Sequence, residues 1–257
     1  ALGRTIQRRL VERNAKVQLE LGGKNPMIVL ADADIDKAVR WTISGAMRMA
    51  GQRCTATSRV IVDERILSQF TEKLVAQVRD LKVGDGLNPS TFVGPVVSEA
   101  QQSQVLDYLH IGMSEGAEVL AGGDALENEE YEEGFYVAPT VFGNVQPSMR
   151  IMQEEIFGPV VGVVGVHGIE HAIEIANGVP FGLSASIATR DLTAALRYAD
   201  AIAAGVVHVN RESANSDFHV PFGGMKASSS HSRELGKAAR DFFTEIKTIY
   251  LQGIGEG

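Results

Sequence analysis

The stretch of this chain from 160 to 166 reads Val160-Val161-Gly162-Val163-Val164-Gly165-Val166. This run predicts a buried strand, and the residues after it predict a helix, a strand, a helix and a strand over 169–177, 184–189, 191–204 and 205–209. Strands that alternate with helices in this way lie parallel in one sheet and are joined by crossover helices. We therefore predict an α/β fold with a mostly parallel sheet.

The first half of the chain shows further elements of the same kinds. Pro26 to Leu30 predicts a short apolar strand, and Asp34 is placed to cap a helix that ends at Gly51. Val17 to Leu21 alternates in polarity and predicts a strand that ends in a turn at Gly22-Gly23. Other predicted elements are a helix over 1–16, a strand at 60–62, a helix opened by Asp63, a helix from Ser98 to about Glu115 and a strand over 118–121.

The last block of the chain, over 242–251, reads Phe242-Phe243-Thr244-Glu245-Ile246-Lys247-Thr248-Ile249-Tyr250-Leu251. Its alternation in polarity predicts a strand. A strand so near the end of the chain would either complete a sheet or leave an edge that needs a partner.

Composition narrows the class of protein. The 257 residues are 44% hydrophobic and 22% charged, which is typical of a soluble globular protein with an ample core. The net charge of −8, without a cluster of Lys and Arg, argues against a nucleic-acid partner or an anionic membrane. No apolar run reaches the ~18 residues of a membrane span. A single cysteine excludes an internal disulfide framework and suits a reducing compartment, so we expect a cytoplasmic protein.

That single cysteine, Cys54, lies after a predicted helix, among small and basic residues. A lone cysteine is either a small buried hydrophobe or a reactive thiol. Glu20 lies upstream at a predicted strand end, and reactive groups of α/β sheets collect at the carboxyl ends of strands. A carboxylate there can accept a thiol proton and later activate a water molecule. Alone, Glu20 is equally well explained as a solvated charge.

Four sequence blocks together resemble the signature of the aldehyde dehydrogenase superfamily, in the order and spacing of that family. They are Glu20-Leu21-Gly22-Gly23-Lys24, Gly51-Gln52-Arg53-Cys54, Glu154-Glu155-Ile156-Phe157-Gly158-Pro159 and Pro221-Phe222-Gly223-Gly224. The resemblance covers essentially the whole chain. It implies the catalytic domain of that family, which oxidises an aldehyde to a carboxylic acid with NAD or NADP and uses no metal.

The resemblance implies a role for each matching residue. Cys54 would be the nucleophile that forms a thiohemiacetal and then a thioacyl enzyme, and its backbone N–H would supply half of an oxyanion hole. Glu20 would activate the hydrolytic water. Glu155 would hold the nicotinamide ribose, and Phe157 would pack near the nicotinamide, although plain core packing also explains a phenylalanine. The backbone at Leu21 and Gly22 would approach the nicotinamide, because Gly22 has no Cβ.

The C-terminal blocks bear on the substrate. Pro221-Phe222-Gly223-Gly224 resembles the segment that closes the substrate funnel, although its glycines are also explained by a simple turn. Arg211 and His219 lie in the preceding loop and could meet an acidic substrate, or could be solvated loop charges. The segment Ser228-Ser229-Ser230-His231-Ser232-Arg233-Glu234 departs from the glycine-containing pattern of most members. It resembles a branch that acts on semialdehydes such as α-ketoglutarate semialdehyde.

The resemblance also implies a division of the chain. Residues 1–20 would be the C-terminal end of a cofactor-binding domain whose remainder is absent, together with an oxyanion-hole Asn. Residues 21–232 would form the catalytic domain, and 233–257 a C-terminal segment with an oligomerisation strand, giving a homo-oligomer (dimer or tetramer). Two alternatives stay open: a Cys-dependent esterase or hydrolase without redox chemistry, and an inactive fragment that lacks most of the cofactor site.

Overall fold

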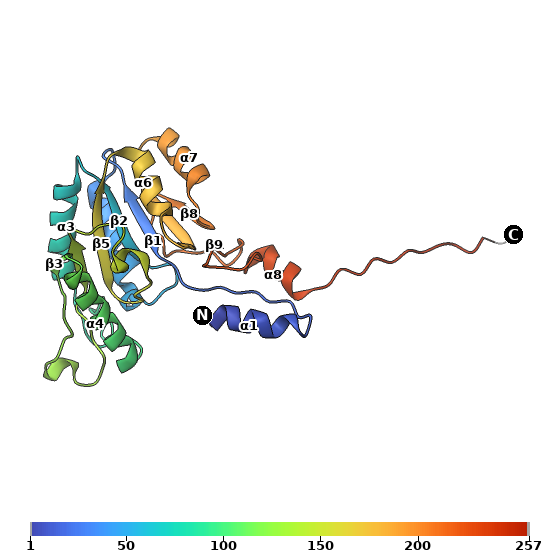
Figure 1. Cartoon of the computed structure of the whole chain (residues 1–257), viewed down its shortest axis with the longest axis horizontal. Helices are drawn as coiled ribbons and strands as arrows, with labels where there is room; N and C mark the ends of the chain where they lie inside the picture. Colours follow the sequence, from blue (N-terminus) through green and yellow to red (C-terminus); the bar gives the residue numbers. More distant parts are fainter. Residues whose placement is uncertain (1, 256–257) are drawn as a thin grey trace.

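A computed structural model of the chain describes residues 2–255. Its central feature is a seven-stranded sheet with the strand order β3-β4-β5-β2-β1-β7-β8 (Figure 1). All neighbouring strands are parallel except β3, which runs antiparallel to β4. The strands are β1 Asn25–Val29, β2 Thr57–Asp63, β3 Glu118–Ala121, β4 Thr140–Gly143, β5 Val160–Val166, β7 Ser184–Ala188 and β8 Val206–Val209. The predicted α/β class with a mostly parallel sheet is confirmed.

Helices cover both faces of this sheet. One apolar core joins the sheet to α4 (Glu99–Ser114), α5 (Arg150–Gln153), α6 (Gly168–Asn177) and α7 (Leu192–Ala201). A second core on the opposite face joins it to α2 (Ile35–Met47) and α3 (Leu67–Arg79). Within β1, Ile28 faces the first core, while Met27 and Val29 face the second. Because both faces are covered, the strands are continuous apolar runs, which made the region around 160–209 predictable.

Capping residues start the helices where the sequence indicates. The Asp34 carboxylate accepts a hydrogen bond from Lys37 N–H (3.1 Å), and the Ser98 hydroxyl accepts one from Gln101 N–H (3.3 Å). Each satisfies a backbone donor that the first helical turn leaves free. Asp63 was expected to open a helix, but it is the last residue of β2, and α3 begins only at Leu67. Its carboxylate instead accepts the N–H of Arg65 in the connecting turn.

The N-terminal region differs from the sequence prediction. The first helix, α1, spans Leu2–Val11 rather than 1–16. Val17 to Leu21 forms no strand: in this region only Glu20 pairs, in an isolated antiparallel bridge with Ser229. The segment alternates because it runs along one loop, not because it belongs to a sheet. Gly22 and Gly23 form no turn either, and they continue extended into β1.

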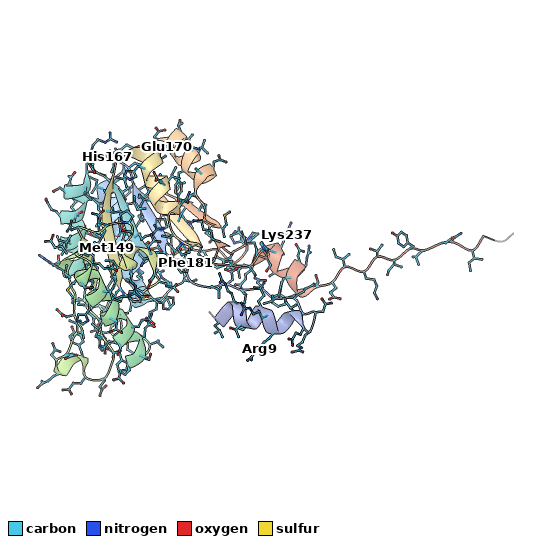
Figure 2. The ribbon with its side chains drawn as sticks, viewed as in Figure 1. Arg9, Met149, His167, Glu170, Phe181 and Lys237 are labelled. Atoms are coloured by element: carbon cyan, nitrogen blue, oxygen red, sulfur yellow. The ribbon has the colours of Figure 1, made fainter. Side chains whose placement is uncertain are left out.

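The C-terminal prediction also needs correction. Phe242 and Phe243 end a helix, α8 (Gly236–Phe243), and residues 244–255 form no regular element. Thr244 still contacts Arg240 and Lys16, and beyond it the tail runs away from the sheet, with its side chains apart from the rest of the chain (Figures 1 and 2). An alternating strand needs a neighbouring strand for its backbone hydrogen bonds, and residues 2–255 of this one chain place none beside the tail. A short two-stranded sheet, β6 (Phe181–Gly182) with β9 (Met225–Lys226), precedes α8.

Candidate active site

The candidate residues lie at one end of three adjacent strands. Glu20 and Gly22 precede β1, Cys54 precedes β2, and Glu155 and its neighbours precede β5. Since β5, β2 and β1 are adjacent and parallel, the segments that lead into them converge where these strands begin. These are the amino ends of the strands, so the expectation of a site at the carboxyl ends is wrong. The segments that enter the sheet carry these groups, not the loops that leave it.

Close backbone approaches bring the three segments together. The N–H of Gly23 donates a hydrogen bond to Glu155 Oε1 at 3.0 Å. A Cβ at Gly22 would lie 2.1 Å from Glu155 Oε2, so only glycine fits against this carboxylate. Gly51 has φ +68°, and a Cβ there would lie 2.0 Å from the carbonyl oxygen of Gly158. Gly22 and Gly51 therefore allow the signature block 154–159 to lie against both of the blocks that contain them.

Asn25 fixes the turn that carries Cys54, and the sequence analysis did not identify it. Its amide nitrogen donates to the carbonyl oxygens of Cys54 and Ala56 (2.9 Å each), and its amide oxygen accepts from Ser184 N–H (3.0 Å). The residue is buried at the head of β1. The available signal was a polar side chain at the start of an apolar strand, because a buried amide needs partners for all its polar atoms.

Replacing Asn25 with leucine should strongly destabilise the fold. The change removes three hydrogen bonds and leaves two carbonyls and one N–H unpaired in a buried site. We expect a loss of about 2–4 kcal/mol in the free energy of unfolding, measured by urea denaturation. The same change at exposed Asn88 should cost under about 1 kcal/mol. Equal losses for the two variants would contradict the role given to Asn25.

The Cys54 thiol is half-buried, and burial is the main cause that raises its pKa. The backbone N–H groups of Thr55 and Cys54 act in the opposite direction. The negative charges of Glu155 and Glu20 raise the pKa of the thiol further, which places both carboxylates within electrostatic reach of the sulfur. A thiol in this environment needs a proton acceptor before it can attack as a thiolate.

Glu20 is a carboxylate with one oxygen held and the other able to accept a proton. Its Oε2 accepts a hydrogen bond from the Ser229 hydroxyl at 2.7 Å. Its Oε1 is buried and has no hydrogen-bond partner among residues 2–255. Burial is the main cause that raises the pKa of Glu20. The pKa of this carboxyl group therefore lies closer to neutral pH than that of a solvated glutamate. The solvated alternative for Glu20 therefore does not describe this half-buried group.

Glu155 and Phe157 lie on the segment that enters β5. Burial raises the pKa of Glu155, while the Gly23 N–H and the Lys24 charge oppose this rise. Phe157 is half-buried and has φ +59°, and its carbonyl accepts from the side chain of Gln101 at 3.0 Å. A positive φ is uncommon for a residue other than glycine, so the backbone of this segment turns sharply at Phe157. Leu21 is 39% exposed, with its methyl groups beside Gly3 of α1.

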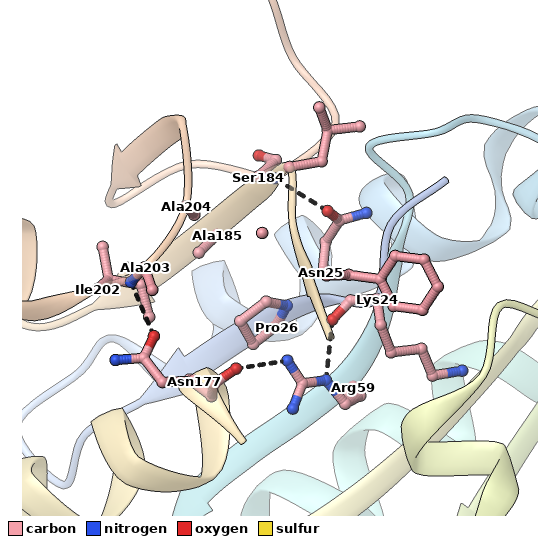
Figure 3. Close-up of a pocket in the computed structure, with 14 residues that line it drawn as sticks. Lys24, Asn25, Pro26, Arg59, Asn177, Ser184, Ala185, Ile202, Ala203 and Ala204 are labelled. Carbon is pink, nitrogen blue, oxygen red and sulfur yellow. Dashed lines mark hydrogen bonds between the residues drawn. The ribbon is translucent and has the colours of Figure 1, made fainter. Parts of the chain in front are cut away.

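Lys24 is fully buried directly behind these residues, and no hydrogen bond from its Nζ occurs within residues 2–255. Burial, followed by the charge of Arg59, lowers the pKa of Lys24 to about 7. Figure 3 shows Lys24 and Arg59 at a small cavity between β1, β2 and β7, with Arg59 bonded to the Lys24 carbonyl. The cavity measures about 10 Å³, which is room for one water and not for a substrate.

The loop 211–219 begins beside the Cys54 turn. The Ser213 hydroxyl donates to the Thr55 carbonyl (2.9 Å) and lies 2.8 Å from the Thr57 hydroxyl. Arg211 is half-buried and its carbonyl accepts from the Ser186 hydroxyl, whereas His219 is exposed. In residues 2–255, no hydrogen bond or charge interaction links Arg211 or His219 to Cys54 or Glu20. The structure thus gathers Cys54, Glu20, Glu155 and Gly22, and leaves the side chains of Arg211 and His219 outside this cluster.

Two further properties concern the part of the chain from 2 to 255. No group of three or more His, Cys, Asp or Glu side chains there is placed to hold a metal ion. No helix there combines the length and apolar character that crossing a membrane requires.

Known proteins with similar sequences and structures are aldehyde dehydrogenases. The chain is 50% identical over 251 residues to alpha-ketoglutaric semialdehyde dehydrogenase of Bacillus subtilis, covering 98% of this chain and 51% of the relative. It is 44% identical to alpha-ketoglutarate semialdehyde dehydrogenase of Haloferax volcanii, covering 97% and 52%. The NAD+ complex of an aldehyde dehydrogenase from Bacillus cereus superimposes with a TM-score of 0.92 at 39% identity, covering 97% and 50%. The chain spans about half the length of the curated relatives it matches.

The family assignment rests on nearly the whole chain. The sequence model of the Aldehyde dehydrogenase family matches residues 1–249, a range that contains all four signature blocks. The mostly parallel sheet and the convergence of Cys54, Glu20 and Glu155 at the amino ends of its strands agree with this match. This chain belongs to the aldehyde dehydrogenase family.

Proposed function

We propose that this chain is the catalytic part of an NAD(P)-dependent aldehyde dehydrogenase that oxidises a semialdehyde to a carboxylic acid. The observation that carries the proposal is that the only cysteine, before β2, lies within electrostatic reach of Glu20, before the adjacent β1, and that Glu20 has one oxygen held by Ser229 and the other free. Two relatives at 50% and 44% identity carry the name of an α-ketoglutarate semialdehyde dehydrogenase, which supports a substrate of this class.

The first half of the reaction uses the thiol. Cys54 gives up its proton to solvent, and the sulfur electron pair forms a bond to the aldehyde carbon, giving a thiohemiacetal. The backbone N–H of Cys54 is suited to stabilise the negative charge that develops on the aldehyde oxygen. When bound, NAD(P)+ supplies the acceptor for the hydride that leaves the same carbon, and a thioester on Cys54 remains.

The second half of the reaction uses the carboxylate. The free Oε1 of Glu20 accepts a proton from water while the water oxygen adds to the thioester carbon. The C–S bond then breaks, its electron pair returns to the Cys54 sulfur, and the carboxylic acid leaves. The proton on Glu20 then returns to the Cys54 sulfur, so Glu20 acts in the hydrolytic half of the reaction.

The residues around Gly22 fit a nicotinamide nucleotide. Glu155 offers an acceptor-only group, which suits the paired hydroxyls of a ribose. Gly22 presents backbone without a Cβ beside this carboxylate. Phe157 offers an aromatic ring on the same segment as Glu155. We assign Glu155, Phe157, Leu21 and Gly22 to cofactor binding on this basis.

Replacing Gly22 with alanine should impair use of the cofactor. The new Cβ would lie 2.1 Å from Glu155 Oε2 and would displace this carboxylate. We expect kcat/KM for NAD(P)+ to fall by about 10²-fold, measured in initial-rate assays. Gly86→Ala is the matched control, because no atom lies within 4 Å of a Cβ built there. A Gly22→Ala enzyme with the wild-type KM and kcat would remove Glu155 from the assignment.

Arg211 and His219 are our proposed contacts for the second, acidic end of a semialdehyde. Ser213, between them in the sequence, anchors the loop to the turn of Cys54, which supports placing the loop at the entrance to the site. Replacing Arg211 with glutamine removes the positive charge. The variant should raise KM for an acidic semialdehyde and not for a neutral aldehyde of similar length.

Further parts of the proposal concern the organisation of the protein. We assign residues 1–20 to the end of a cofactor-binding domain, 21–232 to the catalytic domain and 233–257 to a C-terminal oligomerisation segment. The tail exposes Ile246, Ile249, Tyr250, Leu251 and Ile254, which suits burial against a second copy in a dimer or tetramer. A monomer in sedimentation would contradict this arrangement. A catalytic free thiol also suits a reducing, cytoplasmic location.

The experiment that tests the function is NADH formation by the complete protein with α-ketoglutarate semialdehyde. A dehydrogenase reduces the nucleotide in proportion to the acid formed. A Cys-dependent hydrolase cleaves an activated ester without nicotinamide and forms no NADH. Ester hydrolysis without NADH formation would favour the hydrolase. Activity of the complete protein that residues 1–257 alone lack would favour the inactive fragment.

A further inference from the structure

The serine-rich segment 228–234, which sets this chain apart from the common family pattern, lies along the residues that carry Glu20. The N–H of Leu21 donates to the Ser228 carbonyl (2.7 Å) and the N–H of Ser230 donates to the Leu19 carbonyl (2.9 Å). The N–H of Leu19 also donates to the Ser230 hydroxyl (2.9 Å). These bonds hold the backbone on both sides of Glu20 and place Ser229 opposite its side chain.

The hydroxyl of Ser229 has a fixed direction. It accepts a hydrogen bond from the N–H of Gly224 at 2.6 Å and donates its single proton to Glu20 Oε2 at 2.7 Å. Because a hydroxyl has only one proton to give, the bond from Gly224 leaves that proton for the carboxylate. Gly224 belongs to the turn of 221–224. Glu20 is therefore connected through one hydroxyl to the segment assigned to the substrate funnel.

We propose that Ser229 is a positioning residue for the hydrolytic half of the reaction: its hydroxyl holds Oε2 of Glu20 and thereby orients the free Oε1 to accept the proton of water. The inference rests on the function proposed above. It adds a residue that acts through Glu20 and not on the substrate.

The charges around Glu20 determine how loss of the hydroxyl changes the pH dependence. Burial raises the pKa of Glu20 most and the charge of Glu234 raises it further, while the Ser229 bond and the charge of Arg233 lower it. The Cys54 thiol faces Glu20 from the turn before β2. A hydrogen bond to the ionised carboxylate favours the charged form, so its removal raises the pKa. Glu20 would then be protonated, and inactive as a base, up to a higher pH.

The test measures hydrolysis of the thioester on Cys54 as a function of pH, in the complete protein. The variants are Ser229→Ala, Ser229→Thr, which keeps the hydroxyl, and His231→Ala, which alters an exposed side chain of the same segment. In Ser229→Ala, the acidic limb of the pH profile for thioester hydrolysis should move to a pH about 1 unit higher. At a pH on this limb, hydrolysis should be ~10-fold slower than in the wild type. The NADH burst and the KM for aldehyde should stay at wild-type values.

The controls separate this inference from the proposed function. Ser229→Thr should restore the wild-type limb, and His231→Ala should not move it. If Glu20→Gln blocks hydrolysis but Ser229→Ala keeps the wild-type profile, the role of Ser229 is wrong and the proposed function stands. A limb that moves equally in His231→Ala also overturns the role, because it indicates a general change in the segment. If the wild-type protein forms no acyl group on Cys54, both proposals fall.

Discussion

Replacing Cys54 with alanine is expected to lower kcat/KM for aldehyde oxidation by about 10⁴-fold or more, because no other group can form the covalent bond to the substrate. Cys54 is the only cysteine in the chain, so no second thiol of this chain can substitute for it. The measurement is initial-rate NADH formation by the complete protein at saturating nucleotide. The loss should appear in kcat, since the variant removes the chemical step and leaves the residues assigned to cofactor binding unchanged.

Two controls test whether the loss of activity comes from unfolding or from weaker nucleotide binding. The side chain is half-buried and small, so Cys54→Ala should cost only about 1 kcal/mol in stability, which urea denaturation can check. Nucleotide affinity measured by calorimetry should match that of the wild type. If Cys54→Ala retained full oxidation, the thiol would be structural and the assignment of the nucleophile would be wrong.

Glu20→Gln should produce the second largest effect and a different kinetic pattern. Glutamine keeps the size of the side chain and an oxygen that can accept the Ser229 hydrogen bond, but it cannot accept a proton near neutral pH. Hydrolysis of the thioester should slow by about 10²–10⁴-fold, the range for a positioned general base. A burst of NADH equal to one per active site should precede this slow phase.

Glu154→Gln is the matched control for Glu20→Gln. Glu154 carries the same functional group in another signature block, but its carboxylate binds Arg150 and Tyr108 at the surface of α5. The rate of thioester hydrolysis in Glu154→Gln should stay within about 3-fold of the wild type, because a substitution at the surface has a small effect. Equal slowing in the two variants, or a Glu20→Gln enzyme that turns over normally, would contradict the role of Glu20.

The sequence predicted those parts of the fold whose signals are local. Val160 to Val166 is apolar on both faces because α2 and α3 cover one side of the sheet and α4 to α7 the other. Asp34 and Ser98 cap their helices through residues only three positions away. By contrast, β4 (Thr140–Gly143) is too short to show a pattern of its own, and its strand character comes from its neighbours β3 and β5.

The two wrong strand predictions share one physical reason, which is that alternation in polarity does not specify the hydrogen-bond partners of a segment. Val17 to Leu21 alternates, yet its backbone partners lie in the loop 228–230. Phe242 and Phe243 belong to the helix α8 and not to a strand. The tail that follows them has the pattern of a strand, and residues 2–255 contain no strand beside it.

The candidate site was predicted from its motifs, but its geometry depends on the order of the strands in the sheet. Cys54 and Glu20 lie within electrostatic reach because β1 and β2 are adjacent and both segments enter the sheet at the amino ends of these strands. No local pattern specifies that order. The partners of the two residues are also distant in sequence: Ser229 is 209 positions from Glu20. Asn25, which holds the Cys54 turn, is 29 positions from it.

The central claim is that the sulfur of Cys54 and the carboxylate of Glu20 serve one reaction centre. The most direct test is the intact mass of the complete Glu20→Gln protein after it is mixed with α-ketoglutarate semialdehyde and NAD(P)+, followed by peptide mapping. The account predicts an acyl adduct on the Cys54 peptide that accumulates in step with the NADH burst and is absent in wild-type protein after turnover. Steady NADH formation with an unmodified Cys54 peptide, or with the adduct on another residue, would contradict it.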